Sequence, residues 1–142
     1  MLLPVLAVKD MEASLDFYTQ KLGFEITMSM NGPDEKPNFV FVNKGAARLG
    51  LSLSPYPEPA GNGVVFMLYP GQDYDIDQDY NSFQEKGVTI AEPIKSEYWG
   101  DRVFSLRDPD GYYLTFCKEV AAPSMDEIAE VHKAVSAAAE HA

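Results

Sequence analysis

Two stretches of the chain, residues 10–26 and 75–90, repeat one pattern of hydrophobic and polar positions. Their apolar side chains recur every three or four residues, which places them on one face of a helix. These side chains are Met11, Leu15, Tyr18 and Leu22 in the first stretch and Ile76, Tyr80 and Phe83 in the second. Each stretch starts with an aspartate, which the helix dipole favours, and carries a glycine near its end. The pattern therefore predicts two related amphipathic helices.

Apolar segments of strand length flank each predicted helix. They cover residues 2–8, 24–30, 38–42 and 47–54 around the first helix, and 63–69, 88–94, 102–106 and 112–117 around the second. Between the two sets, residues 54–63 (SPYPEPAGNG) contain three prolines and two glycines, a composition typical of a connector. Each half of the chain is thus predicted to run strand–helix–strand–strand–strand, which gives an α+β fold of two βαβββ modules.

The C-terminal residues predict a third helix. Ser124 and Glu127 have the spacing of a capping box, in which the serine hydroxyl binds a backbone N–H of the first turn. The apolar stripe that follows consists of Ile128, Val131, Val135 and Ala138. Such a stripe usually packs on the helix's own body. We expect a single domain over residues 1–122, with modules at about 1–54 and 63–121, and a helical tail over 123–142.

The charge balance limits the class of partner. The 142 residues have a formal net charge of −11 and a pI near 4.4, which disfavours nucleic acid and anionic membrane surfaces as partners. No apolar run approaches the ~20 residues that span a bilayer. The single cysteine, Cys117, cannot form an intramolecular disulfide. The sequence therefore predicts a cytoplasmic protein with no nucleic-acid or membrane partner, whose acidic surface suits a cationic or neutral small molecule.

Residues 71–80 (GQDYDIDQDY) place an aspartate at every second position from Asp73 to Asp79. Calcium loops also use alternating carboxylates, but they need a glycine at the sixth position and a glutamate at the twelfth. Here Gln78 and Gln84 stand at those positions. Acids favoured at the start of a helix explain the run better.

Three sequence features occur together with the duplicated module. VKD opens the first predicted helix, FYTQKLGF closes it, and WGDRVFSLRDPDGYYLTF forms the last predicted hairpin. In this combination, over roughly residues 2–120, the chain resembles the vicinal oxygen chelate superfamily. That superfamily contains glyoxalase I, extradiol dioxygenases, fosfomycin-resistance enzymes and bleomycin-resistance proteins. The resemblance implies curved mixed sheets that surround a cleft.

The resemblance also implies where a metal would bind. In the metal enzymes of the superfamily, the first and last strands of each module each contribute a His, Glu or Gln ligand. The matching positions in this chain are Leu3, Leu49, Val65 (or its neighbours Val64 and Phe66, since the register of this strand is open) and Thr115, and none of them carries a carboxylate or an imidazole. We therefore predict that the protein binds no metal and no cofactor. In this respect it is closest to the metal-free bleomycin-resistance-like members of the superfamily.

Seven residues are candidates for ligand binding: Phe39, Phe41, Leu49, Trp99, Tyr113, Thr115 and Cys117. Trp99 is the single tryptophan and stands beside Tyr98 in a glycine-containing connection. Aromatic residues on such loops often form contact surfaces. The bleomycin-resistance proteins that this segment resembles stack an aromatic side chain on a planar drug, so Trp99 is predicted to contact the ligand.

Strand periodicity orders the other candidates. Tyr113, Thr115 and Cys117 share one face of the last predicted strand because side chains alternate with a period of two. Phe39 and Phe41 share a face in the same way, and they either line the cleft with Trp99 or form core under the helices. Cys117 has no histidine near it to act as a base, which favours a buried filler over a nucleophile.

The sequence thus predicts a metal-free protein that binds a small organic molecule in an aromatic-lined cleft, with no assigned catalytic residue. Dimeric bleomycin-resistance proteins sequester a cationic drug in this way. A homodimer is expected because open curved sheets expose apolar surface. Two alternatives stay open. One is a lyase, isomerase or dioxygenase with a non-standard site, for example with Tyr113 as acid or base; the other is an interaction module that retains the scaffold alone.

Overall fold

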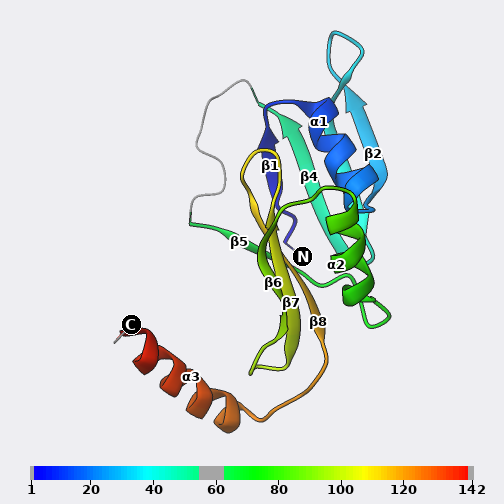
Figure 1. Cartoon of the computed structure of the whole chain (residues 1–142). Coiled ribbons are helices and arrows are strands. Elements are labelled where there is room, and N and C mark those ends of the chain that lie inside the picture. Colours follow the sequence, from blue (N-terminus) through cyan, green and yellow to red (C-terminus); the bar gives the residue numbers. More distant parts are fainter. Residues whose placement is uncertain (1, 55–62, 141–142) are drawn as a thin grey trace.

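The computed structural model describes residues 2–54 and 63–140 (Figure 1). The first module contains β1 (Val5–Val8), α1 (Met11–Leu15), its continuation η1 (Asp16–Lys21), β2 (Glu25–Asn31), β3 (Pro37–Lys44) and β4 (Ala47–Leu53). The second contains β5 (Val65–Leu68), α2 (Ile76–Glu85), β6 (Ile90–Ser96), β7 (Asp101–Arg107) and β8 (Tyr113–Glu119), and α3 (Met125–Glu140) follows. Most of the predicted connector at 54–63 lies outside the described residues.

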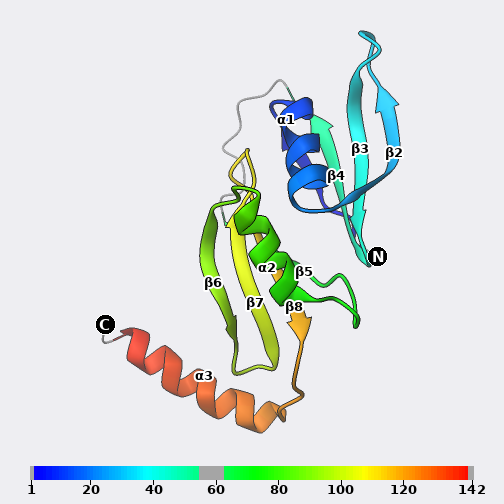
Figure 2. The ribbon, with the colours of Figure 1, turned by 45° about the vertical axis from the view of Figure 1, so that its right-hand side comes forward.

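The strands form two four-stranded mixed sheets, one in each module (Figure 2). Their strand orders are β1-β4-β3-β2 and β5-β8-β7-β6. In each sheet the first and last strands of the module pair in parallel, and the other neighbours pair antiparallel. The predicted α+β class, with two βαβββ modules and a C-terminal helix, is confirmed.

The predicted helix starts are also confirmed by their hydrogen bonds. The carboxylates of Asp10 and Asp75 each accept from the backbone N–H three residues later, at 3.0 Å in both helices. Each bond satisfies a backbone donor that the first helical turn leaves free. At the start of α3, the hydroxyl of Ser124 accepts from the equivalent N–H at 3.1 Å.

The first helix departs from a regular α-helix in its second half. Residues 16–21 adopt π-helical geometry, and the N–H of Leu22 donates to the carbonyl of Phe17 at 3.0 Å. The wider turn changes the rotation of successive side chains. As a result Phe17 and Tyr18, neighbours in the sequence, are both buried. Of these two residues, the helical hydrophobic pattern predicts the burial of Tyr18 only.

The helix-facing sides of both sheets share one hydrophobic core. Its strand residues include Leu6, Val8, Val40, Val42, Leu49 and Leu51 from the first module and Phe104, Leu106, Leu114 and Phe116 from the second. The rings of Phe24 and Phe116 meet edge to face across the two modules, with centroids 6.4 Å apart. Burial of these apolar groups holds the modules together on their helix sides. The opposite face of each sheet therefore points outward.

Two buried or partly buried polar contacts fix the modules against each other. The hydroxyl of Tyr18 donates to the carboxylate of Asp108 at 2.8 Å. Burial raises the pKa of both groups, and the nearby Asp108 charge raises that of Tyr18 further. Lys44, at the end of β3, pairs with Asp79 of α2 at 2.9 Å and donates to the carbonyl of Leu22 at 2.9 Å. Both contacts join segments that are far apart in the sequence.

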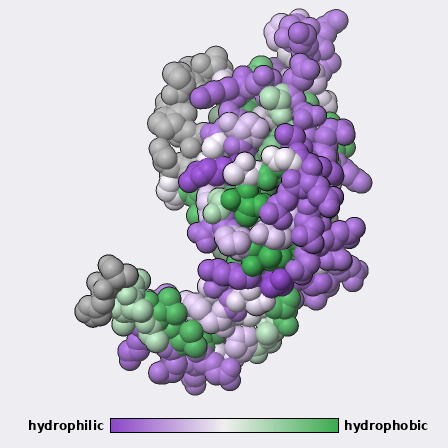
Figure 3. All heavy atoms as spheres, viewed as in Figure 1, coloured by the Kyte–Doolittle hydropathy of each residue, from purple (hydrophilic) through white to green (hydrophobic). Residues whose placement is uncertain are grey.

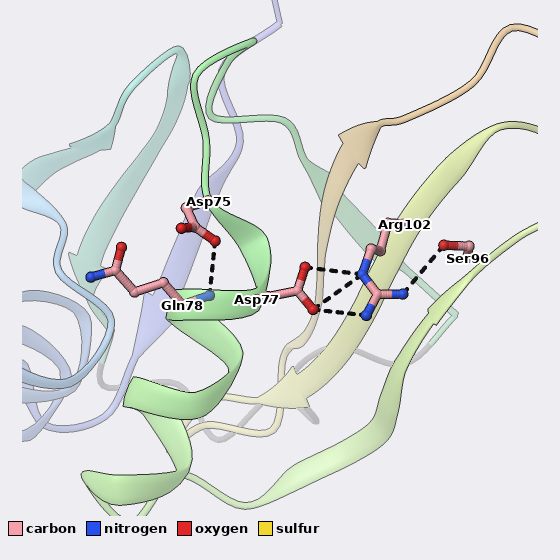
Figure 4. A network of polar contacts seen from close by, with 5 residues as sticks. All are labelled: Asp75, Asp77, Gln78, Ser96 and Arg102. Carbon is pink, nitrogen blue, oxygen red and sulfur yellow. Dashed lines mark hydrogen bonds and ion pairs between the residues drawn. The ribbon is translucent and has the colours of Figure 1, made fainter.

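The aspartates at the start of α2 are engaged within the chain (Figure 4). Asp75 caps the helix, Asp79 pairs with the lysine of β3, and Asp77 receives hydrogen bonds from Arg102 of β7, the shortest at 2.7 Å. Arg102 also donates to the hydroxyl of Ser96 at 3.2 Å. Three of the four alternating aspartates thus serve the fold, in agreement with the helix-start interpretation of this run.

Helix α3 extends away from the body in both ribbon views (Figures 1 and 2). A hydrogen bond of 2.7 Å between the Tyr98 hydroxyl and Nδ1 of His132 connects it to the second module. Val131 and Val135 of its apolar stripe are 42% and 50% exposed, and hydrophobic surface is visible along this helix in Figure 3. The expectation that the stripe packs on its own body is therefore wrong. No helix within the described residues, α3 included, is long and apolar enough to cross a membrane.

Candidate functional site

The outward face of the second sheet carries the candidates from the last hairpin. In β8 the core residues Leu114 and Phe116 alternate with Tyr113, Thr115 and Cys117. Because successive side chains of a strand point to opposite faces, these three lie on the side of the sheet away from the helices. The three side chains therefore share one face of β8, as strand periodicity predicts.

This outward face is hollowed into a cleft of about 270 Å³. Its lining residues include Val65, Met67, Trp99, Ser105, Tyr113 and Thr115. Three of the predicted ligand-binding residues, Trp99, Tyr113 and Thr115, are therefore brought together. The volume lies just below the roughly 300 Å³ at which ligand pockets usually begin. A cleft of this size accommodates a small ring system, or forms one wall of a larger site.

The indole of Trp99 is held in one orientation. Its Nε1–H donates to Oδ2 of Asp101 at 3.1 Å, and the hydroxyl of Tyr69 donates to the same oxygen at 2.6 Å. Burial and the Asp101 bond raise the pKa of Tyr69, so this hydroxyl remains a donor at neutral pH. The ring of Tyr98 stands edge-on to the indole at 5.0 Å. Trp99 is thus ordered before any ligand arrives, which lowers the entropy lost on binding.

Charged side chains border the cleft on the β6 side. Glu92, Lys95 and Glu97 belong to its lining, and Lys95 pairs with Glu97 at 3.1 Å. Within the described residues Glu92 forms no ion pair. The lining thus carries two carboxylates and one ammonium group, and this excess of negative charge favours a cationic ligand.

Phe39 and Phe41 lie on the outward face of the first sheet, since Val40 between them is buried in the core. Their rings are 5.2 Å apart in an edge-to-face arrangement. The ring of Phe41 covers Gly50, where an added Cβ would approach it to 3.2 Å. Neither phenylalanine is among the residues that line the described cleft of the second sheet. They are therefore neither core nor, within one chain, neighbours of Trp99.

Leu49 is not among the described residues that line the cleft at Trp99. It is fully buried in the core, and in sheet register it corresponds to Leu114 of the second module. The position that corresponds to Thr115 is Gly50, which pairs with β1 and β3 as Thr115 pairs with β5 and β7. The assignment of Leu49 to the ligand site is wrong by one residue, and a shift of one residue moves a strand side chain to the opposite face.

Cys117 is separated from the cleft. Its side chain is 1% exposed and borders a smaller hollow of about 130 Å³ that Tyr69 also lines. Burial raises the pKa of the Cys117 thiol to about 11. Its predicted place in the ligand site is therefore not supported, whereas the interpretation as buried filler agrees with this environment.

We expect Cys117 to resist alkylation in the folded protein. A thiol pKa raised from 9.0 to about 11 lowers the thiolate fraction near pH 8 by about a hundredfold, and burial slows the reaction further. Iodoacetamide labelling followed by mass spectrometry measures this, because the chain has one cysteine. The same reaction in concentrated guanidinium chloride is the control. Equal rates with and without denaturant would contradict the burial of this thiol.

A larger hollow of about 550 Å³ lies beside α1, with Lys9, Asp10, Asp34 and Lys36 in its lining. Two of its three carboxylates, those of Asp10 and Asp34, already have structural roles. Asp10 caps α1, and Asp34 accepts from the N–H of Lys36 at 3.0 Å in a turn. No aromatic side chain lines this hollow among the described residues. The cleft at Trp99 is therefore the better candidate for an organic ligand.

Three residues of the site, Tyr69, Asp101 and Ser105, were not among the sequence candidates. Ser105 could have been found, because the tight turn at 108–111 sets the hairpin register that places it opposite Thr115. Tyr69 and Asp101 are 32 positions apart; Tyr69 directly follows β5, whereas Asp101 begins β7, which is not a neighbour of β5 in the sheet. No local pattern in the sequence indicates that contact.

The duplicated βαβββ topology and the cleft on its sheet face agree with a match to a known family. The model of the Glyoxalase/Bleomycin resistance protein/Dioxygenase superfamily matches residues 2–116. The chain belongs to this superfamily.

Individual relatives support the fold. Mb0911c of Mycobacterium bovis, an uncharacterized protein, is 27% identical over 136 residues, which cover 88% of this chain and 87% of that protein. A superfamily member from Sphaerobacter thermophilus is 30% identical, with a TM-score of 0.59 over 82% of this chain and 94% of its own. TioX from Micromonospora is 18% identical, with a TM-score of 0.68 over 87% of this chain and 99% of its own. These similarities establish the superfamily and the fold.

The metal site implied by the enzymes of the superfamily does not fit the residues of this chain. With Gly50 in place of Leu49, the four positions carry Leu3, Gly50, Val65 and Thr115. The Thr115 hydroxyl is bonded to Ser105 at 2.8 Å. In residues 2–54 and 63–140, no group of three or more His, Cys, Asp or Glu side chains could hold an ion.

Proposed function

We propose that this protein binds a small aromatic compound, preferentially a cationic one, in the cleft of the second sheet, without a metal and without changing the compound. The side-chain chemistry of the cleft supports this proposal. It combines an ordered indole, a tyrosine ring, two buried hydroxyls and an excess of carboxylates. Aromatic faces recognise planar rings and cations, and the carboxylates add to the attraction for positive charge. The function is of the bleomycin-resistance type.

An enzymatic role has less support from the site. The Cys117 thiol has a raised pKa and lies outside the cleft, so it does not suit a nucleophile. The guanidinium of Arg107 lies over the ring of Tyr113, 5.1 Å from its centroid, and because a guanidinium stays protonated it cannot act as a base for this tyrosine. The four strand positions discussed above do not provide a metal-ligand set.

Calorimetric titration with 1-methylquinolinium and with naphthalene tests the proposal. These probes have similar ring systems and differ in charge, so we expect the quinolinium to bind more tightly and to be recovered unchanged. Elemental analysis of protein purified without a metal-affinity tag is expected to show far less than one transition-metal ion per chain. Stoichiometric metal that disappears on mutation of a carboxylate, together with no binding of either probe, would sink the proposal.

We also propose that the protein forms a homodimer in which the first sheet of one copy covers the cleft of the other. Outward-facing residues of both modules support this arrangement: Val5, Val65 and Met67 are 50%, 57% and 47% exposed. Exposed apolar surface of this kind marks interaction sites. In a two-fold dimer, Phe39 and Phe41 of each copy would face the cleft of the other, and the cleft would become a closed pocket.

Val5→Lys is expected to shift the dimer toward monomer, because it places a charge on the apolar face of the first sheet without removing a core side chain. Sedimentation should give about twice the 15.7 kDa mass of one chain for the natural protein. Gln84→Lys, on the exposed face of α2, makes a similar change of charge elsewhere and should leave the mass unchanged. A natural protein that sediments as a monomer at micromolar concentration would contradict the dimer.

A further inference from the structure

The floor of the cleft contains two hydroxyl groups that are bonded to each other. Ser105 of β7 and Thr115 of β8 are directly opposite in the sheet, and Oγ of Ser105 lies 2.8 Å from Oγ1 of Thr115. Their side chains are 5% and 8% exposed. Both residues belong to the cleft lining. A buried polar pair is therefore set in a surface whose nearby strand residues are apolar.

The pair leaves one donor unused. Each hydroxyl has one hydrogen to donate and two lone pairs to accept with. One hydrogen is used in the bond between the two residues. Within the described residues, no protein group accepts the second hydrogen. A buried donor without an acceptor costs free energy, so this O–H requires water or a ligand atom in the cleft.

The surroundings decide which kind of ligand atom fits. Val65, Met67 and Val103 line the cleft around the pair and offer no hydrogen-bonding side chain. The one ammonium group of the lining, on Lys95, is engaged by Glu97. The nearby guanidinium of Arg107 is also engaged, because it lies over the ring of Tyr113 and donates to the carbonyl of Gly111 at 2.8 Å. An anionic group placed on the pair would be desolvated without a positive partner, which is costly. A neutral acceptor, such as a carbonyl or ether oxygen, meets the free O–H without that cost.

We propose that Ser105 and Thr115 are specificity-determining residues that select aromatic compounds with a neutral hydrogen-bond acceptor on the edge that enters the cleft. This inference rests on the proposed function, and it adds the chemical group that the floor recognises. The aromatic ring of such a compound lies against Trp99 and Tyr113, and its carbonyl or ether oxygen accepts from the hydroxyl pair. An alkyl group at the same place leaves the donor unsatisfied.

Three probes that differ in one substituent test this inference: 6-acetyl-1-methylquinolinium, its 6-ethyl analogue and its 6-carboxylate. Calorimetry is expected to show the acetyl probe binding about five- to tenfold more tightly than the ethyl probe, which corresponds to one hydrogen bond. The carboxylate is expected to bind more weakly than either. In the double variant Ser105→Ala/Thr115→Val, the acetyl and ethyl probes should bind equally, and the ethyl probe should bind more tightly than it binds the natural protein, because no donor is left unsatisfied.

Single variants and the ethyl probe separate recognition from general damage to the fold. Ser105→Ala or Thr115→Val alone should retain part of the preference, because either remaining hydroxyl still donates. If the natural protein binds acetyl and ethyl probes equally, or if the double variant keeps the preference, this inference fails while the proposed function stands. If the natural protein binds none of the three probes, both fail. The comparison in the natural protein decides the question even when the double variant does not fold.

Discussion

Replacement of Trp99 by alanine is expected to weaken the binding of 1-methylquinolinium by about five- to hundredfold. Stacking adds about 0.5–1.5 kcal/mol beyond area burial, and a cation over an indole face adds about 0.5–2 kcal/mol. The indole is already oriented by its bond to Asp101, so the natural protein does not lose entropy in ordering it. Calorimetry measures the change, and the intrinsic fluorescence of the single tryptophan reports binding in the natural protein.

Two matched variants distinguish stacking from charge. Trp99→Phe keeps an aromatic face but loses the N–H that binds Asp101, so it should weaken binding less than alanine does. Asp101→Asn keeps a hydrogen-bond acceptor for Trp99 and Tyr69 while removing the buried charge. It should weaken the binding of the quinolinium probe and leave that of naphthalene nearly unaffected, because only the cationic probe is attracted by the charge. Unchanged quinolinium affinity in Trp99→Ala would show that Trp99 is a packing residue.

Gly45→Ala is expected to lower the free energy of unfolding by about 2–4 kcal/mol, which is large for one methyl group. Gly45 joins β3 to β4 with φ at +56°, and a Cβ there would clash with the carbonyl oxygen of Pro70. That oxygen accepts from the N–H of Ala46 at 2.9 Å, a bond between the two modules. Alanine would be strained in its own backbone and would also push the β3–β4 turn away from the second module.

Gly87→Ala is the matched control for this prediction. Gly87 follows α2 with φ at +84°, but no atom lies within 4 Å of an added Cβ. It should therefore cost the backbone strain alone, about 1 kcal/mol. Urea denaturation gives both values. If both variants lose the same free energy of unfolding, the close approach of residue 45 to Pro70 adds nothing to the cost of backbone strain.

The local elements of this protein could be predicted from its sequence. Asp10, Asp75 and Ser124 mark helix starts through hydrogen bonds that span three residues, and each bond forms as expected. The repeated hydrophobic pattern gave the two modules, because a helix face and a strand face each bury apolar groups at a fixed period. Strand periodicity grouped Tyr113, Thr115 and Cys117, of which the first two line the cleft, and Trp99, chosen as an aromatic residue on a loop, lines it with them.

The tertiary structure determined which face of each strand is buried and which side chains contact one another. In β4 the leucines at 49, 51 and 53 alternate with Arg48, Gly50 and Ser52, which fixes the phase of the strand, but only the packed sheet shows that the leucine face lies in the core and the Gly50 face points outward. The bond from Tyr69 to Asp101 joins residues 32 positions apart and depends on how the sheet is assembled. The packing of the two modules on their helix sides turned both sheet faces outward. These features arise from contacts between distant segments, where burial of the whole core, and not the preference of any short stretch, sets the arrangement.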